Sequence, residues 1–227
     1  MVESQEQVAT LNLVDSLAEQ AVLESLIESA KPPLPEGARN LHWLLATPFR
    51  YPPLPHGSRF GRRHEPALFY AALSRETLLH ECAYYRFVFR TGMAEPPPAL
   101  LHSQHTLFQA RYGSAQGVQL HKPPFDAFGD ALRSPTDYGP TQALGQAMRR
   151  AGVVLFEYAS ARDPAGGTNV ALFAPEGLRS RRPTRQQAWL CETGDEQVSF
   201  WAKGEDRAWQ FPRALFEVDG RLPRPAA

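Results

Sequence analysis

Hydrophobic residues recur at helical spacing in several segments of this chain. Residues 8–31 have the pattern of an amphipathic helix, which ends at Lys31 because two prolines follow. Ser74 is a suitable N-cap for a later helix, and Gly92 lies just past its end. The spacing predicts three further helices, over 38–46 (before Pro48), from Ser74 to about Arg90, and over 140–151.

Short apolar runs between and after these helices are typical of buried strands. They lie at 67–73, 104–112, 117–121, 153–158, 169–173, 187–192 and 197–202. The last two flank Thr193-Gly194-Asp195-Glu196 and predict a hairpin. Because helices and strands alternate irregularly, the pattern favours an α+β domain with a mostly antiparallel sheet over a doubly wound one.

The chain divides into three segments on this pattern. Residues 1–45 form an N-terminal helical extension that we expect to pack on the domain, and residues 46–221 form the domain itself. Residues 222–227 form a Pro-rich tail that we expect to be frayed. A length of 227 residues with 43% hydrophobic residues suffices for one substantial core.

Composition and charge exclude several classes of protein. Lys plus Arg and Asp plus Glu both number 24, so the zero net charge argues against a nucleic-acid binder held by bulk charge. No apolar run approaches the roughly 20 residues of a membrane span, and the polar first residues do not resemble a signal peptide. We therefore expect a soluble, cytoplasmic protein without a membrane partner. His102 and His105 have a metal-like spacing but no accompanying ligands, so no metal site is predicted.

Two arginines suggest an anion site. Arg59 lies between glycines in Gly57-Ser58-Arg59-Phe60-Gly61, where the backbone can approach a ligand closely. Arg50 precedes Tyr51 nearby, and two guanidinium groups can hold a pyrophosphate. Taken alone, such a loop more often carries a solvated arginine.

Three more residues carry candidate chemistry. Tyr70 ends a buried strand, Glu81 lies on the apolar side of the helix after it, and Ser160 follows another strand. The alternatives are a core tyrosine, a solvated carboxylate and an ordinary turn. If Arg59, Tyr70 and Glu81 converge in one cleft, they suit a ligand that carries both a phosphate and a cationic ring.

In order along the chain, these residues resemble the RES-domain family, named for its Arg, Glu and Ser. The matching blocks are Gly57-Ser58-Arg59-Phe60, Leu68-Phe69-Tyr70-Ala71, Leu78-Leu79-His80-Glu81, Asp137-Tyr138 with Thr141-Gln142, Tyr158-Ala159-Ser160-Ala161-Arg162, and the strand from Asn169 to Phe173. The resemblance covers roughly residues 45–175. The segment between Arg50 and Arg59 is shorter than in many members, and the last fifty residues match weakly.

The resemblance implies a fold like that of ADP-ribosyltransferase toxins and NAD as substrate, with no other cofactor. It implies a toxin opposed by an Xre-type helix-turn-helix antitoxin. Arg59, Glu81 and Ser160 would be catalytic. Arg50, Tyr51, Arg59, Tyr70 and Ser160 would bind NAD, with Arg59 on the diphosphate or on an inorganic phosphate acceptor.

The leading hypothesis is thus a toxin that cleaves the nicotinamide–ribose bond of NAD by phosphorolysis or hydrolysis. The alternatives are a mono-ADP-ribosyltransferase that modifies a protein target and a catalytically idle module that binds a partner. The sequence does not name the acceptor, the antitoxin or the oligomeric state.

Overall fold

The computed structural model of this protein describes residues 1–4, 10, 13–51 and 57–224. Its helices and strands in chain order are β1 (Val2–Glu3), α1 (Leu17–Ala30), α2 (Trp43–Arg50), β2 (Phe69–Ala72), α3 (Arg75–Thr91), β3 (Leu101–Gln109), β4 (Gly117–Gln119), α4 (Gly129–Leu132), α5 (Gly139–Arg150), β5 (Leu155–Ala159), β6 (Thr168–Leu172), β7 (Arg185–Thr193), β8 (Gln197–Ala202) and β9 (Ala208–Pro212).

The strands form two sheets. One has five strands in the order β1-β3-β7-β8-β9, all antiparallel, and the other has four in the order β2-β6-β5-β4. Within the second sheet only the β4–β5 pair is parallel. The predicted α+β domain with a mostly antiparallel sheet is confirmed, and so is the hairpin of β7 and β8.

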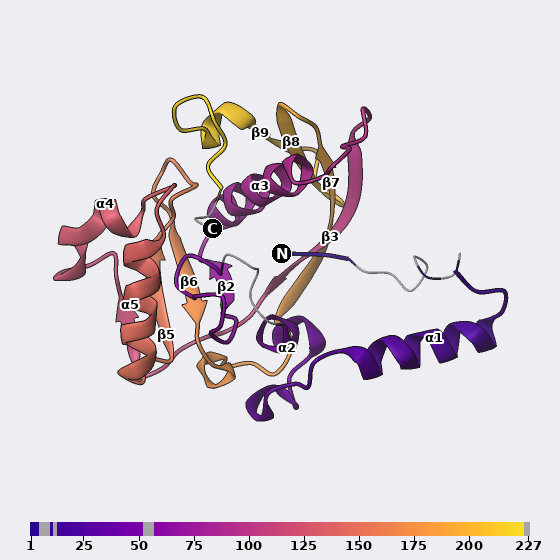
Figure 1. The fold of residues 1–227 in the computed structure, drawn as a ribbon, viewed down its shortest axis with the longest axis horizontal. Helices are drawn as coiled ribbons and strands as arrows, with labels where there is room; N and C mark the ends of the chain where they lie inside the picture. The colour runs from indigo at the N-terminus through magenta and orange to yellow at the C-terminus, as the bar shows by residue number, and fades with distance from the viewer. Residues whose placement is uncertain (5–9, 11–12, 52–56, 225–227) are drawn as a thin grey trace.

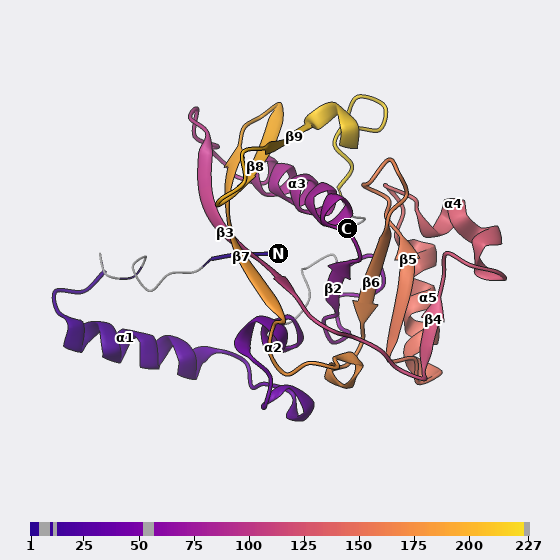
Figure 2. The same ribbon diagram turned by 180° about the vertical axis from the view of Figure 1, so that it is seen from behind.

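The core has three parts, and α3 connects the two sheets. One apolar face of α3 packs on the five-stranded sheet around Trp189 and Phe200. Phe156 and Met148 belong to a second cluster, between the four-stranded sheet and α5, and Leu45 to a third, beneath α2. Figures 1 and 2 show α3 beside the five-stranded sheet and α5 covering one face of the other. The central strands β5 and β6 of this sheet are thus buried on both faces, which explains their apolar runs.

Local signals placed α3 and α5 correctly. The Ser74 hydroxyl accepts a hydrogen bond from the Thr77 amide, and Gly92 follows the last turn of α3, as predicted. The short helix predicted over 38–46 is instead α2, which continues past Pro48. Because α2 buries Leu44, Leu45 and Phe49, we attribute its persistence to packing, which outweighs the cost of an internal proline.

The N-terminal segment differs most from expectation. Helix α1 begins at Leu17, and residues 8, 9, 11 and 12 of the predicted 8–31 helix lie outside the described residues. Its Leu17 and Leu26 are 79% and 61% exposed, so these two residues do not pack on the domain. Figure 1 shows α1 extending away from both sheets. Residues 2–3, in contrast, add an edge strand to the five-stranded sheet.

The C-terminal segment is attached where we predicted a frayed tail. The Tyr84 hydroxyl donates a 2.6 Å hydrogen bond to the carbonyl of Pro223, and Leu222 packs against the core beneath α3. The prediction was therefore wrong up to residue 224; residues 225–227 lie outside the described residues. None of the helices in the described part of the chain has the length and apolar composition to cross a membrane.

Candidate active site

Glu81 is held in place by two side chains from the four-stranded sheet. Its Oε1 accepts hydrogen bonds of 2.6 Å from the Ser160 hydroxyl and 2.6 Å from the Asn169 amide. Glu81 lies on α3, Ser160 directly follows β5 and Asn169 lies on β6. Oε2 makes no hydrogen bond to a described residue and is not among the buried unpartnered atoms. One carboxylate oxygen is therefore fixed and the other is open.

The Ser160 hydroxyl has its hydrogen committed to Glu81. Its oxygen accepts 3.0 Å bonds from the backbone amides of Arg162 and Asp163, so only the hydroxyl proton is left to donate. The turn from Ser160 to Asp163 is attached to α3, because Thr77 donates a 2.8 Å bond to the Asp163 carboxylate. A methyl group at Gly167 would lie 1.9 Å from the Thr77 hydroxyl, so this position requires glycine.

Arg59 is buried, with 7% of its surface exposed. Its loop begins at Gly57, whose φ of +75° favours glycine. The guanidinium donates a 2.8 Å bond to the Ser134 carbonyl and lies 4.4 Å from the centre of the Tyr138 ring. Arg59 is therefore not a solvated surface residue.

Tyr70 supports the loop that carries Arg59. Its hydroxyl lies 2.9 Å from the Ser58 hydroxyl and accepts a 3.2 Å bond from the Phe60 amide. Although 37% of the residue is exposed, the hydroxyl end is enclosed by these partners, and this burial raises the pKa of Tyr70 to about 12. At neutral pH Tyr70 is thus a neutral hydrogen-bonding group.

Arg162 joins the Arg59 side of the site to the Glu81 side. Its guanidinium donates a 3.1 Å bond to the Tyr138 hydroxyl, next to Arg59, while its backbone amide binds Ser160. The guanidinium also lies 3.6 Å from the centre of the Tyr84 ring. A continuous set of contacts therefore runs from Arg59 through Tyr138, Arg162 and Ser160 to Glu81.

Tyr158 lies on the same face of the four-stranded sheet as Tyr70 and Asn169, between the Arg59 side and the Glu81 side of the site. It pairs with Asn169 across β5 and β6, and its ring lies 6.5 Å from that of Tyr70. Burial raises its pKa well above the ordinary value, the charge of Glu81 and the phenol of Tyr70 raise it further, and Arg59 lowers it. Arg59, Tyr70, Glu81 and Ser160 are thus brought together despite their separation in sequence.

Four residues of this site had no specific role assigned from the sequence: Tyr85, Tyr138, Arg162 and Asn169. Arg162 was noted only as a basic group just past a strand, where binding groups are common. Tyr85 lies one helical turn after Glu81 and is 43% exposed, and i, i+4 spacing on a helix was the only signal for it. The other three stood in the family-like blocks, where only their surroundings in the fold reveal what they contact.

Arg50 and Tyr51 lie apart from this set of contacts. The Arg50 guanidinium forms a 2.7 Å ion pair with Glu28 of α1 and donates a 2.5 Å bond to the Pro32 carbonyl. Tyr51 is 40% exposed. Their predicted part in NAD binding stays a prediction, and for Arg50 it requires release from Glu28.

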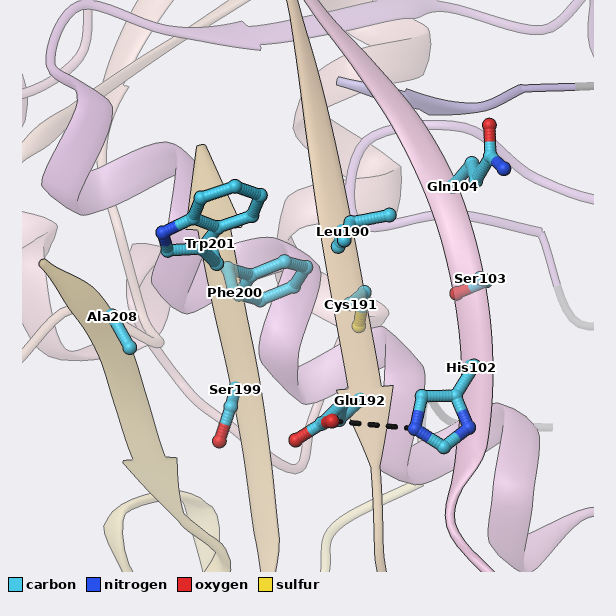
Figure 3. Close-up of a pocket in the computed structure, with 10 residues that line it drawn as sticks. All are labelled: His102, Ser103, Gln104, Leu190, Cys191, Glu192, Ser199, Phe200, Trp201 and Ala208. Carbon is cyan, nitrogen blue, oxygen red and sulfur yellow. Dashed lines mark hydrogen bonds and ion pairs between the residues drawn. The ribbon is translucent and has the colours of Figure 1, made fainter. Parts of the chain in front are cut away.

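A hollow on the surface lies away from these residues. Figure 3 shows it on the five-stranded sheet, with Trp201, Leu190 and the His102–Glu192 pair among its lining residues; its volume is about 580 Å³. A second hollow, of about 370 Å³, adjoins Pro175 and Arg179. Neither is lined by Arg59, Tyr70, Glu81 or Ser160.

The two histidines with metal-like spacing are separated by the sheet. His105 is 6% exposed and contacts the Ser103 hydroxyl, whereas His102 lies on the opposite face beside Glu192. A spacing of three residues on a strand places side chains on opposite faces, so these two cannot share an ion. Among the described residues, no group of three His, Cys, Asp or Glu is placed to hold a metal.

The family model of the RES domain matches residues 34–194. This chain belongs to the RES domain family. The matched segment contains every predicted site residue, from Arg50 to Ser160. Membership is consistent with an NAD-related module of a toxin–antitoxin system. No protein with a curated description matches the chain. Strands β1, β8 and β9 lie outside the matched segment but complete the five-stranded sheet behind α3.

Proposed function

We propose that this RES domain protein is a toxin that degrades NAD by cleaving the bond between nicotinamide and ribose, with inorganic phosphate or water as acceptor. The observation that carries the proposal is the state of Glu81. Its carboxylate is fixed through Oε1 by Ser160 and Asn169, at 2.6 Å each, and keeps Oε2 open. A preorganised negative group is what a reaction with a developing positive charge requires.

The chemistry follows from NAD itself. When the glycosidic bond breaks, its electron pair moves to the ring nitrogen, and the cationic nicotinamide leaves as a neutral molecule. The ribose carbon becomes oxocarbenium-like, and the charge of Glu81 stabilises it or orients the acceptor. An acceptor oxygen then forms the new bond and releases a proton. Because Ser160 and Asn169 hold Glu81, its charge need not reorganise during the reaction.

Other residues would position the substrate. Arg59 would bind the diphosphate, because no carboxylate of the described residues forms an ion pair with its guanidinium, and the ring of Tyr70 would lie against nicotinamide. Ser160 would act chiefly through Glu81, because its hydroxyl proton is already donated there. Tyr51 would be a further contact, and Arg50 would join by leaving Glu28.

The family suggests the cellular setting of this activity. We propose a cytoplasmic toxin, a partner antitoxin of the Xre helix-turn-helix type, and a fold related to ADP-ribosyltransferases. The two mostly antiparallel sheets, with α3 packed between them, support the last point. The same bond cleavage with a protein acceptor would make the chain a mono-ADP-ribosyltransferase.

The test is to incubate the purified protein with NAD, with and without phosphate, and to identify the products. We expect nicotinamide release, faster with phosphate and accompanied by a phosphorylated ADP-ribose. Glu81→Gln should lower the rate roughly 100- to 1000-fold. The matched control is Glu76→Gln, an exposed carboxylate on the same helix, which should leave the rate unchanged.

Each other outcome points to a different function. Free ADP-ribose at a rate indifferent to phosphate indicates hydrolysis. A modified protein band in a lysate indicates ADP-ribosyl transfer. If no nicotinamide appears under any condition, the chain is an idle partner-binding module and the proposal is wrong.

A further inference from the structure

Two arginines of the site are buried without a counter-charge. Arg59 and Arg162 are 7% and 4% exposed, and neither forms an ion pair with a carboxylate of the described residues. Two other buried arginines each have one, since Arg86 pairs with Glu3 and Arg90 with Asp195, both at 2.8 Å. A buried cation is costly unless an anion accompanies it, so the exceptions point to an anion from outside the chain.

The two guanidinium groups meet at one phenol. Arg59 lies 4.4 Å from the centre of the Tyr138 ring, and Arg162 donates a 3.1 Å bond to the Tyr138 hydroxyl. Each also binds a carbonyl of the segment before Tyr138, Arg59 that of Ser134 at 2.8 Å and Arg162 that of Pro135 at 3.0 Å. These contacts fix both groups before any ligand arrives, which lowers the entropy cost of binding.

Part of each guanidinium group remains available to donate hydrogen bonds to a ligand. Nε of Arg59, and Nε and Nη1 of Arg162, make no hydrogen bond within the described part of the chain, and none is among its buried unpartnered atoms. Two guanidinium groups with open donors match the several oxygens of a diphosphate better than those of one carboxylate.

We propose that Arg162 and Arg59 together form a diphosphate site around Tyr138, and that Arg162, rather than Arg50, is the second guanidinium that grips NAD. The inference rests on the proposed function for the identity of the ligand. Its placement fits, because Arg162 lies two residues after Ser160, which holds Glu81. The diphosphate would then sit beside the ribose whose bond is cleaved, as the covalent structure of a dinucleotide requires.

The test measures diphosphate binding apart from catalysis. ADP-ribose, which has no nicotinamide to lose, is titrated by calorimetry into the wild-type protein, Arg162→Gln and Arg90→Gln. The control Arg90 is as buried as Arg162, at 3% exposed, and also binds backbone carbonyls, but it already has a carboxylate partner. We expect Arg162→Gln to weaken ADP-ribose roughly 10- to 100-fold and Arg90→Gln to leave the affinity within a few-fold.

Steady-state kinetics with NAD separates binding from a merely structural role. Arg162→Gln should raise KM while kcat stays within a few-fold. A lower kcat at unchanged ADP-ribose affinity would show that Arg162 only orients Ser160 and would overturn the inference, as would unchanged affinity alone. If Arg162→Gln does not fold, Arg162→Lys replaces it, because lysine keeps the charge and loses the fork; equal affinity in that variant also overturns the inference.

The two proposals fail separately. If nicotinamide is never released but ADP-ribose binds in an Arg162-dependent way, the diphosphate site is supported and the proposed NAD cleavage is refuted. If NAD is cleaved and Arg162→Gln binds ADP-ribose like the wild type, NAD cleavage stands and the diphosphate site falls.

Discussion

Ser160 and Glu81 are 79 positions apart in the chain and are joined by a hydrogen bond of 2.6 Å. The Ser160 oxygen also accepts two backbone N–H bonds, so its single proton is directed at the carboxylate. This arrangement makes Ser160 a positioning residue for Glu81. It also explains how a serine after a strand and a glutamate on a helix can act as one unit.

We therefore predict that Ser160→Ala lowers kcat for nicotinamide release roughly 10- to 100-fold, since a hydrogen bond to a charged group contributes about 1.5–3 kcal/mol. In the Glu81→Gln background the same change should have little further effect, because the group that Ser160 orients has lost its charge. The rates of the wild type, the two single variants and the double variant complete a double-mutant cycle. Fully additive effects would show that Ser160 acts independently of Glu81.

The sequence predicted the elements of this site better than their contacts. Ser74 and Gly92 mark the ends of α3 through local chemistry, and such signals are readable from one segment alone. The partners of Glu81 are not, because Ser160 and Asn169 reach it only after the four-stranded sheet has packed against α3. An apolar pattern around Glu81 showed that it needed a partner without showing which one.

The role of Arg50 illustrates the same limit. Proximity in sequence to Arg59 suggested a joint anion site, but Arg50 ends a helix that directs it to Glu28. Arg162 follows Arg59 by about a hundred positions in the chain, yet the guanidinium groups of both residues contact Tyr138. A helix was predicted over residues 8–31 and α1 spans Leu17–Ala30 of that range, yet no local signal indicated that Leu17 and Leu26 would be exposed.

Gly145 allows α5 to contact the Arg59 loop directly. A methyl group there would lie 1.9 Å from the Phe60 carbonyl oxygen, a backbone atom that cannot move without shifting Arg59. We predict that Gly145→Ala lowers the free energy of unfolding by about 1–3 kcal/mol and raises KM for NAD.

The control for that prediction is Gly129→Ala. At this position the nearest atom to an added methyl group is 4.0 Å away, at the end of the Arg133 side chain. Alanine normally stabilises a helix relative to glycine by roughly 1 kcal/mol, so this change should be neutral or stabilising. Denaturant titrations of both variants provide the measurement. A Gly145→Ala protein as stable as Gly129→Ala would refute the close approach.

Tyr70 has two separable parts. Its hydroxyl accepts a bond from the amide of Phe60, a residue that is fully buried, so Tyr70→Phe leaves a backbone donor unpaired. We expect a loss of about 1–3 kcal/mol in the free energy of unfolding and a higher KM as the Arg59 loop loosens.

The ring of Tyr70 is tested by the second substitution. Tyr70→Leu removes the aromatic surface as well, and should weaken binding beyond Tyr70→Phe if the ring lies against nicotinamide. Thermal unfolding and KM measured for both variants separate the role of the ring from that of the hydroxyl. Wild-type stability in Tyr70→Phe would mean that the hydroxyl does not support the loop.

His105 should make the stability of the fold depend on pH. Burial of its imidazole, and then the positive charge of Arg86, lower the pKa of His105 from 6.5 to about 4. Between those values the unfolded chain binds a proton that the folded protein does not. The contribution of His105 to the free energy of unfolding is therefore fully present above pH 6.5 and is lost as the pH falls towards 4. The total loss from this one group is about 3 kcal/mol, and there is no further loss below pH 4.

The prediction is checked with His105→Gln, which keeps a polar group near Ser103 and cannot titrate. Its free energy of unfolding should lose less between pH 6.5 and 4 than that of the wild type. His102→Gln is the control on the same strand, because the His102 side chain is 70% exposed and this change removes an imidazole without altering the buried position 105. Carboxylates that titrate in this range contribute equally to all three proteins, so the difference between slopes isolates His105. Parallel curves for His105→Gln and the wild type would show that His105 titrates normally in the folded protein.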